Sequence, residues 1–286
     1  QLGKALLNYE SGAGVFPGFR EYLGKWTGDD PVDLEENSLA GTQSGVPIQT
    51  NDVTWTVMLF PYLEANDLWE RWRSKVAPAD ENNVLYRPRV YLRFLGCPSD
   101  VTDTQTAGQT STSYVANAGY IDPTVARGPA YGVFQDRSSI VARSQQAQMS
   151  LDFLTQRDGS ANTLMVSENL QATEWCPTDA TSGNRRFPQV WDCGFIWAHA
   201  QPAVEGSPSV PAGSHYAINE DMGSTESDLP HARPSSRHPG GVIATFCDGH
   251  TQFLRENIDH VVYMHLMTPD GKATGRLTGV LDPGSF

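Results

Sequence analysis

The side chains best suited to metal binding or catalysis lie in one short stretch, SSRHPGGVIATFCDGHTQFL, which runs from residue 235 to residue 254. It places His238, Asp248 and His250 around two runs of β-forming residues. Imidazole and carboxylate groups on the two sides of a hairpin could meet on one metal ion. In the alternative, which we favour, Asp248 shapes the turn and His238 hydrogen-bonds the backbone before the first strand.

The element that must position these side chains is a hairpin. The runs GVIATFC and HTQFL are separated by Asp248-Gly249. An Asp-Gly pair between such runs predicts a type I′ turn, in which both central residues have φ above zero. Downstream, IDHVVYMHLM carries apolar residues on one helical face, with Asn257 as its expected N-cap. We therefore expect a hairpin followed by a short amphipathic helix within residues 238–267.

Acidic loops offer a second kind of metal site. Calcium prefers carboxylate and carbonyl oxygens to imidazole. Residues 158–162 offer Asp158, and residues 219–228 offer Asp221 and Asp228, but neither loop has EF-hand spacing, so we favour turn formation there. A zinc hydrolase would instead need an open site formed by any three of His215, His231, His238, His250 and Asp248.

Tryptophans and cysteines supply two further candidates. Exposed indole rings bind sugar faces, so Trp175, Trp191 and Trp197 are candidates for a carbohydrate platform. The chain has four cysteines, none of them in a metal-ligand spacing. Cys176 and Cys193 bracket a loop that a disulfide would close with a gain of about 3 kcal/mol. We expect at least one disulfide, and four buried thiols are the alternative.

Composition excludes some partners. The net charge of −13 argues against binding to nucleic acid or to anionic lipid. Apolar runs such as VMLF and GVIATF are far shorter than the roughly 20 residues that a bilayer-spanning helix needs. The chain has no G-x-S-x-G elbow, no HExxH pair and no phosphate-binding glycine pattern, so we expect no enzymatic activity.

The remaining elements are predicted from hydrophobic spacing. The first ten residues, QLGKALLNYE, place apolar side chains at helical spacing without an N-cap, and we interpret residues 1–11 as the end of a longer helix. A second helix is predicted around residues 55–72, broken near Pro61. Short strands are predicted in YLRFLGCPSD, TSYVANAGY and TLMVSE.

Residues 171–237 read differently from the rest of the chain. They are irregular and rich in Gly, Pro and Ser, yet they carry the three tryptophans named above. We expect a folded insertion whose aromatic side chains pack locally. By its length of 286 residues, the chain could form one large domain or two small ones.

The chain resembles a planctomycete family of pilin-like proteins of unknown function, whose hallmark is a His, nine residues and then Asp-Gly. Here the hallmark falls on His238, Asp248 and Gly249. The resemblance extends in order through QLGKALLNYES, WTVMLFPYLEANDLW, FLGCPSD, TSYVANAGY, DGSANTLMVSE and SSRHPGGVIATFCDG. Family members begin with a prepilin-type leader and a hydrophobic helix, which implies that this chain lacks the leader and most of that helix.

The resemblance implies an α+β, type IV pilin-like fold: the end of an N-terminal helix, an antiparallel sheet and large loop-rich insertions. It implies a non-enzymatic pilin or type II secretion pseudopilin subunit of the cell envelope or of an extracellular filament. The precursor would be membrane-anchored, and the missing helix would mediate assembly with itself or with similar subunits. Residues 1–286 would then form a single exposed globular head. Pseudopilins also bind calcium, which implies calcium as a ligand. An extracellular module binding polysaccharide or another ligand, and more distantly a metal-dependent hydrolase, are the alternatives.

Overall fold

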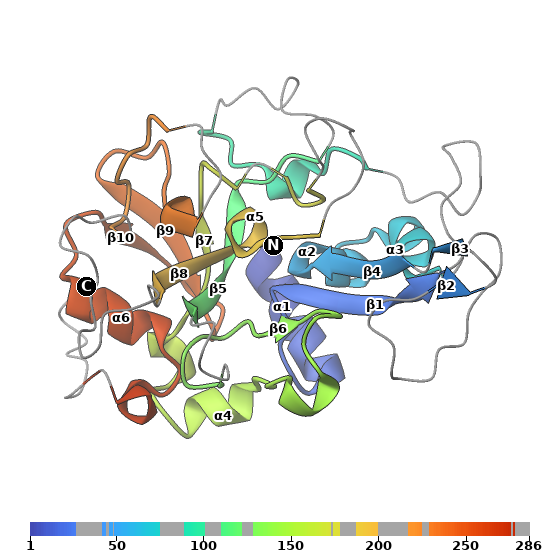
Figure 1. The fold of residues 1–286 in the computed structure, drawn as a ribbon. Helices are drawn as coiled ribbons and strands as arrows, with labels where there is room; N and C mark the ends of the chain where they lie inside the picture. The colour runs from blue at the N-terminus through green and yellow to red at the C-terminus, as the bar shows by residue number, and fades with distance from the viewer. Residues whose placement is uncertain are drawn as a thin grey trace.

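The computed structural model describes residues 1–26, 42–43, 46–47, 49–74, 89–100, 110–121, 128–172, 174–177, 187–199, 217–224, 229–275 and 277. The helices are α1 (Leu2–Ala13), α2 (Trp55–Met58), α3 (Asn66–Arg73), α4 (Leu151–Thr155), α5 (Val190–Cys193) and α6 (His260–Met267). The strands are β1 (Arg20–Trp26), β2 (Thr42–Gln43), β3 (Val46–Pro47), β4 (Gln49–Thr54), β5 (Tyr114–Ile121), β6 (Asp136–Arg137), β7 (Leu164–Glu168), β8 (Gly194–His199), β9 (Gly241–Phe246) and β10 (Thr251–Arg255). The fold is mixed α+β, with two larger sheets and few helices (Figure 1).

The larger sheet has the strand order β10-β9-β7-β5-β8. Neighbours from β10 through β5 are antiparallel, whereas β8 runs parallel to β5. The expected antiparallel sheet is therefore confirmed for four strands and is wrong for β8. The long chain between β5 and β8 includes β7, so it can re-enter the sheet in the same direction. Because β8 lies within residues 171–237, part of the expected insertion belongs to the sheet itself.

Alternation along these strands builds a core on each face of the sheet. Neighbouring residues on one strand join different buried clusters, as Val115 and Ala116 do on β5 and Phe195 and Ile196 do on β8. This is the period of two expected for a sheet buried on both sides. Both faces therefore need a cover.

Helix α1 covers one face and α6 the other. Leu6 of α1 is fully buried with the first cluster, and Gly3 lets the helix approach β9, since a Cβ there would lie 2.8 Å from Thr245 Cγ2. Tyr263 and Leu266 of α6 are buried in the second cluster. Asp259, not the expected Asn257, caps α6 by accepting hydrogen bonds from the N–H groups of the first turn. Within the described part of the chain, no helix is long and apolar enough to cross a membrane.

A three-stranded sheet of order β4-β1-β6 forms the other part of the molecule (Figure 1). The helix predicted around residues 55–72 packs beside it in three pieces: α2, a 3₁₀ turn at Phe60–Tyr62, and α3. The 3₁₀ turn contains Pro61, so the predicted break is confirmed.

The predicted hairpin is formed by β9 and β10, but its turn differs from the expected one. Phe246 N–H donates to His250 O, so three residues separate this bonded pair. Only Gly249 of the Asp-Gly pair has a positive φ, at +91°. A three-residue loop that ends in a left-handed glycine needs one positive φ, whereas the type I′ turn needs two.

Candidate functional site

The predicted triad of His238, Asp248 and His250 is not assembled. At the turn, Asp248 Oδ1 lies 2.6 Å from His250 Nδ1 and accepts the His250 backbone N–H at 3.0 Å. This local pairing is the turn-shaping role that we favoured for Asp248. His238 precedes the first residue of β9 at the opposite end of the hairpin and contacts other residues. The distance along the hairpin keeps the two histidines apart.

The acidic residues proposed for calcium also have local partners. Asp158 Oδ2 accepts the Gly271 backbone N–H at 2.7 Å, and burial raises the pKa of this carboxyl. Asp221 is exposed and lies 3.5 Å from the ring of His231. Asp228 lies outside the described residues, as does His215. No described group of three metal-ligand side chains includes Asp158 or Asp221.

Two of the three candidate tryptophans are buried. Trp175 and Trp197 are each 1% exposed, so they offer no ring face to a polysaccharide. Trp175 packs against Phe60 and Trp72, and Trp197 stacks on Tyr120. Trp191 is partly buried against the first core cluster. The expected local packing within residues 171–237 is wrong for Trp175 and Trp197, because their partners Phe60, Trp72 and Tyr120 all lie outside that range. Burial of both rings removes the support for a carbohydrate platform.

The predicted disulfide is not formed in the structure. Cys176 and Cys193 are buried thiols, like the other two cysteines. The Cys193 thiol donates to the carbonyl of Gln189, the N-cap residue of α5, at 3.3 Å, so its sulfur points back along its own helix. The alternative of four buried thiols describes this structure.

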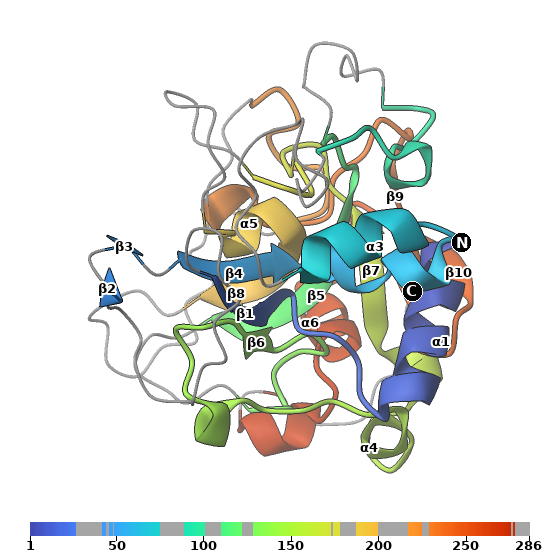
Figure 2. The ribbon, with the colours of Figure 1, turned by 90° about the vertical axis from the view of Figure 1, so that its right-hand side faces the viewer.

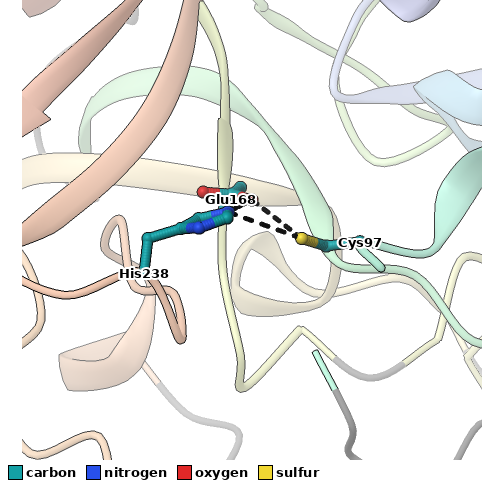
Figure 3. Close-up of side chains that lie close together, drawn as sticks. All are labelled: Cys97, Glu168 and His238. Carbon is teal, nitrogen blue, oxygen red and sulfur yellow. Dashed lines mark hydrogen bonds and ion pairs between the residues drawn. The ribbon is translucent and has the colours of Figure 1, made fainter. Parts of the chain in front are cut away.

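The structure instead brings together Cys97, Glu168 and His238 (Figure 3). Cys97 Sγ donates to Glu168 Oε1 at 3.0 Å and lies 3.8 Å from His238 Nε2. The same imidazole nitrogen is 3.2 Å from Glu168 Oε1. Thiolate, carboxylate and imidazole are all metal ligands, so a metal could be held here. Within the described ranges, no other three residues with such groups come this close.

Each of the three side chains is delivered by a different element. Glu168 is the last residue of β7, in the middle of the sheet. Cys97 follows a short 3₁₀ turn at Arg93–Leu95, and its backbone N–H donates to Ser113 Oγ at 3.0 Å. His238 lies in the loop before β9 and donates its backbone N–H to Ser236 Oγ at 3.0 Å. Backbone anchoring thus fixes where each ligand atom can lie.

The site is shielded from water on the side of Cys97 and Glu168. These residues are 9% and 3% exposed, whereas the His238 side chain is 31% exposed. Burial raises the pKa of the Cys97 thiol, and its hydrogen bond to Glu168 adds to the shift. Burial also raises the pKa of nearby Tyr114 to about 12, with smaller effects from Cys97 and Glu168. Without a bound cation, the thiol is therefore protonated at neutral pH.

Residues 1–260 match a family described as "protein of unknown function (DUF1559)". The chain belongs to this family. No curated protein and no solved structure matches it. The match includes all three side chains of the site, and this family has no function assigned to it.

Sequence reasoning on this DUF1559 chain named His238 but missed its partners. Glu168 is 70 residues from His238 and Cys97 is 141 residues away, so no spacing rule joins them. One signal was present in retrospect: a carboxylate that ends the apolar strand TLMVSE needs polar partners once it is buried. Only the pairing of β7 with β5 and β9 supplies those partners.

Proposed function

We propose that this chain is the globular head of a non-enzymatic, pilin-like or pseudopilin-like subunit of the cell envelope or of an extracellular filament. The observation that carries the proposal is the packing of α1 against the larger sheet. A helix at the start of the chain lies against a sheet whose four strands β10-β9-β7-β5 are antiparallel (Figure 2). That is the arrangement implied by the pilin resemblance.

The contacts of α1 support this interpretation. Its buried residues Leu2, Ala5 and Leu6 join the first core cluster. Its partly buried Leu7 meets the hairpin turn, since a Cβ on Gly249 would lie 2.8 Å from Leu7 Cδ1. The helix is thus held by the Asp248-Gly249 turn as well as by the sheet. A helix fixed to its head in this way can transmit force from an anchored or assembled segment.

The test is to locate the gene product in cells that make it naturally. An antibody against residues 1–286 would be applied to cytosolic, envelope and mechanically sheared surface fractions, with a cytosolic enzyme as the fractionation control. We expect the protein in the envelope or the sheared fraction, and chemical cross-linking of intact cells should yield multimers or mixed complexes. A product confined to the cytosol as a monomer would contradict the proposal.

A further inference from the structure

The three side chains of the site match the ligands of a transition metal in type and in number. One sulfur, one imidazole nitrogen and one carboxylate oxygen converge from Cys97, His238 and Glu168. We propose that they bind one Zn²⁺ ion, with a fourth coordination position left for water or another small donor. This proposal does not depend on the pilin-like function, because an envelope subunit and a protein of another class could each carry such a site.

The distances fit a tetrahedral ion. Zinc bonds of about 2.0 Å to oxygen and nitrogen and about 2.3 Å to sulfur would place the ligand atoms about 3.3 to 3.6 Å apart. The observed separations are 3.0 Å between sulfur and oxygen, 3.2 Å between nitrogen and oxygen, and 3.8 Å between sulfur and nitrogen. Shifts of a few tenths of an ångström would complete the geometry.

The surroundings hold the ligands in place. Glu168 Oε2 accepts the Ile243 backbone N–H at 2.9 Å, which leaves Oε1 for the ion. Ser236 Oγ accepts the His238 backbone N–H at 3.0 Å, and the Ser236 N–H donates to Asn219 Oδ1 at 2.9 Å. Such outer contacts orient metal ligands and commonly matter tenfold or more for metal affinity.

Charge explains why a cation suits this place. On binding, the Cys97 thiol releases its proton to solvent, and bonds form from the metal to sulfur, oxygen and nitrogen. Thiolate and carboxylate together carry two negative charges in a buried setting, and a divalent ion cancels them while the imidazole stays neutral. Thiolate and imidazole favour zinc over calcium, which binds oxygen ligands.

The geometry of these three residues fits a metal site better than it fits a catalytic cysteine. In a Cys-His-carboxylate triad, the thiol and the carboxylate contact opposite nitrogens of the imidazole, so that the acid orients the base. Here Cys97 Sγ and Glu168 Oε1 both face His238 Nε2. Glu168 also accepts a hydrogen bond from the Cys97 thiol directly, and burial raises the pKa of this thiol. Three ligand atoms that face a common point suit a bound metal ion, whereas a catalytic triad needs its groups in a line through the two imidazole nitrogens.

The experiment loads the chelator-stripped 286-residue chain with Zn²⁺, removes loose metal by gel filtration, and counts the retained metal by mass spectrometry. Co²⁺ serves as the optical probe, because a bond to the Cys97 sulfur gives a thiolate charge-transfer band. Ca²⁺ serves as the negative control. We expect one retained Zn²⁺ per chain and the cobalt band, with no retained calcium. Cys97→Ser should abolish the band, and His238→Asn and Glu168→Gln should each weaken zinc binding at least tenfold.

Two controls separate loss of ligands from loss of fold. His250→Asn removes a histidine outside the site and should keep full zinc binding and the cobalt band. X-ray absorption of the unaltered zinc-loaded protein should show one sulfur and lighter nitrogen or oxygen ligands, and this result does not depend on any variant folding. Retention of no zinc by the unaltered protein, or a first shell without sulfur, would overturn the proposal. Equal zinc binding by Cys97→Ser and the unaltered protein would overturn it as well.

Discussion

Glu21 and Glu168 are two buried glutamates, one in each of the larger sheets, and their neighbours differ. Glu21 on β1 is 6% exposed, and its Oε1 accepts the Gly18 backbone N–H at 2.7 Å and lies 3.2 Å from an Arg137 nitrogen. Glu168 on β7 is 3% exposed and faces a backbone N–H, a thiol and an imidazole. Both carboxylates end up buried, but only the second has neighbours with lone pairs to share.

The difference shows what makes a buried carboxylate a binding site. Arginine is permanently charged and has no lone pair for a metal, so Arg137 can only offset the charge of Glu21. Cysteine and histidine can both ligate an ion beside Glu168. Burial alone therefore does not mark a site, and the identity of the second and third groups does.

The largest expected effect is the pH dependence of the free energy of unfolding that Glu21 causes. Burial raises the pKa of Glu21 from 4.5 to about 7, and Arg137 opposes this shift. Between those values the folded state keeps a proton that the unfolded chain releases, so the contribution of Glu21 is complete below pH 4.5 and is lost as pH rises toward 7. At about 1.4 kcal/mol per pKa unit, the loss reaches about 3 kcal/mol.

Glu21→Gln should remove this loss, because the amide keeps an acceptor for Gly18 N–H and does not ionise. Urea unfolding of both proteins at pH 5 and pH 8, with chelator present, measures the change. The variant should gain stability relative to the parent at pH 8. The same dependence on pH in both proteins would show that Glu21 ionises normally in the folded state.

The next effect concerns Glu168 without metal. Glu168→Ala leaves the Ile243 backbone N–H without its acceptor and should lower the free energy of unfolding by about 2 kcal/mol. Glu168→Gln keeps an acceptor oxygen and should cost less than half as much. Urea unfolding in chelator compares the two variants. Equal losses would mean that the hydrogen bond to Ile243 contributes little and that the site is held by its other contacts.

The smallest effect concerns a carboxylate–histidine pair that is not buried. The side chains of Asp248 and His250 are 35% and 40% exposed, so their contact should contribute little. We expect His250→Asn to change the free energy of unfolding by about 0.5 kcal/mol or less. Thermal unfolding with and without Zn²⁺ provides the measurement. A large loss, or a loss of stabilisation by zinc, would show that the turn contributes to the site.

Local rules predicted most of the elements, but the strand expected in YLRFLGCPSD is wrong, because this segment forms a 3₁₀ turn at Arg93–Leu95. Pro61 broke the second helix as expected, because proline cannot continue a helical hydrogen-bond ladder. The Asp-Gly pair predicted the hairpin, but the connection contains Cys247 as well, and this third residue changed the turn type. Asp259 replaced Asn257 as the cap of α6, since both residue types cap helices and only packing chose where the helix begins.

Contacts between distant segments decided the site. The sequence leaves Trp175 and Trp197 as candidates for a carbohydrate platform, because no local pattern distinguishes an exposed tryptophan from a buried one. Cys176 and Cys193 bracket a loop in sequence, yet the Cys193 thiol bonds within its own helix. The sequence predicts an insertion at residues 171–237, because one short strand such as β8 has too few residues for their pattern to show where it pairs in a sheet.

The sequence by itself determined the N-terminal helix, the break at Pro61, the hairpin and its histidine, because each of these follows from residues close together in the chain. The α+β class was implied by the family resemblance and not by local spacing. Only the tertiary structure decided which side chains His238 meets. Strand order brings β7 between β5 and β9, and this placement carries Glu168 to the loop before β9 and to Cys97. Pairing between distant strands depends on the summed burial of both faces of the sheet, which no short stretch of sequence contains.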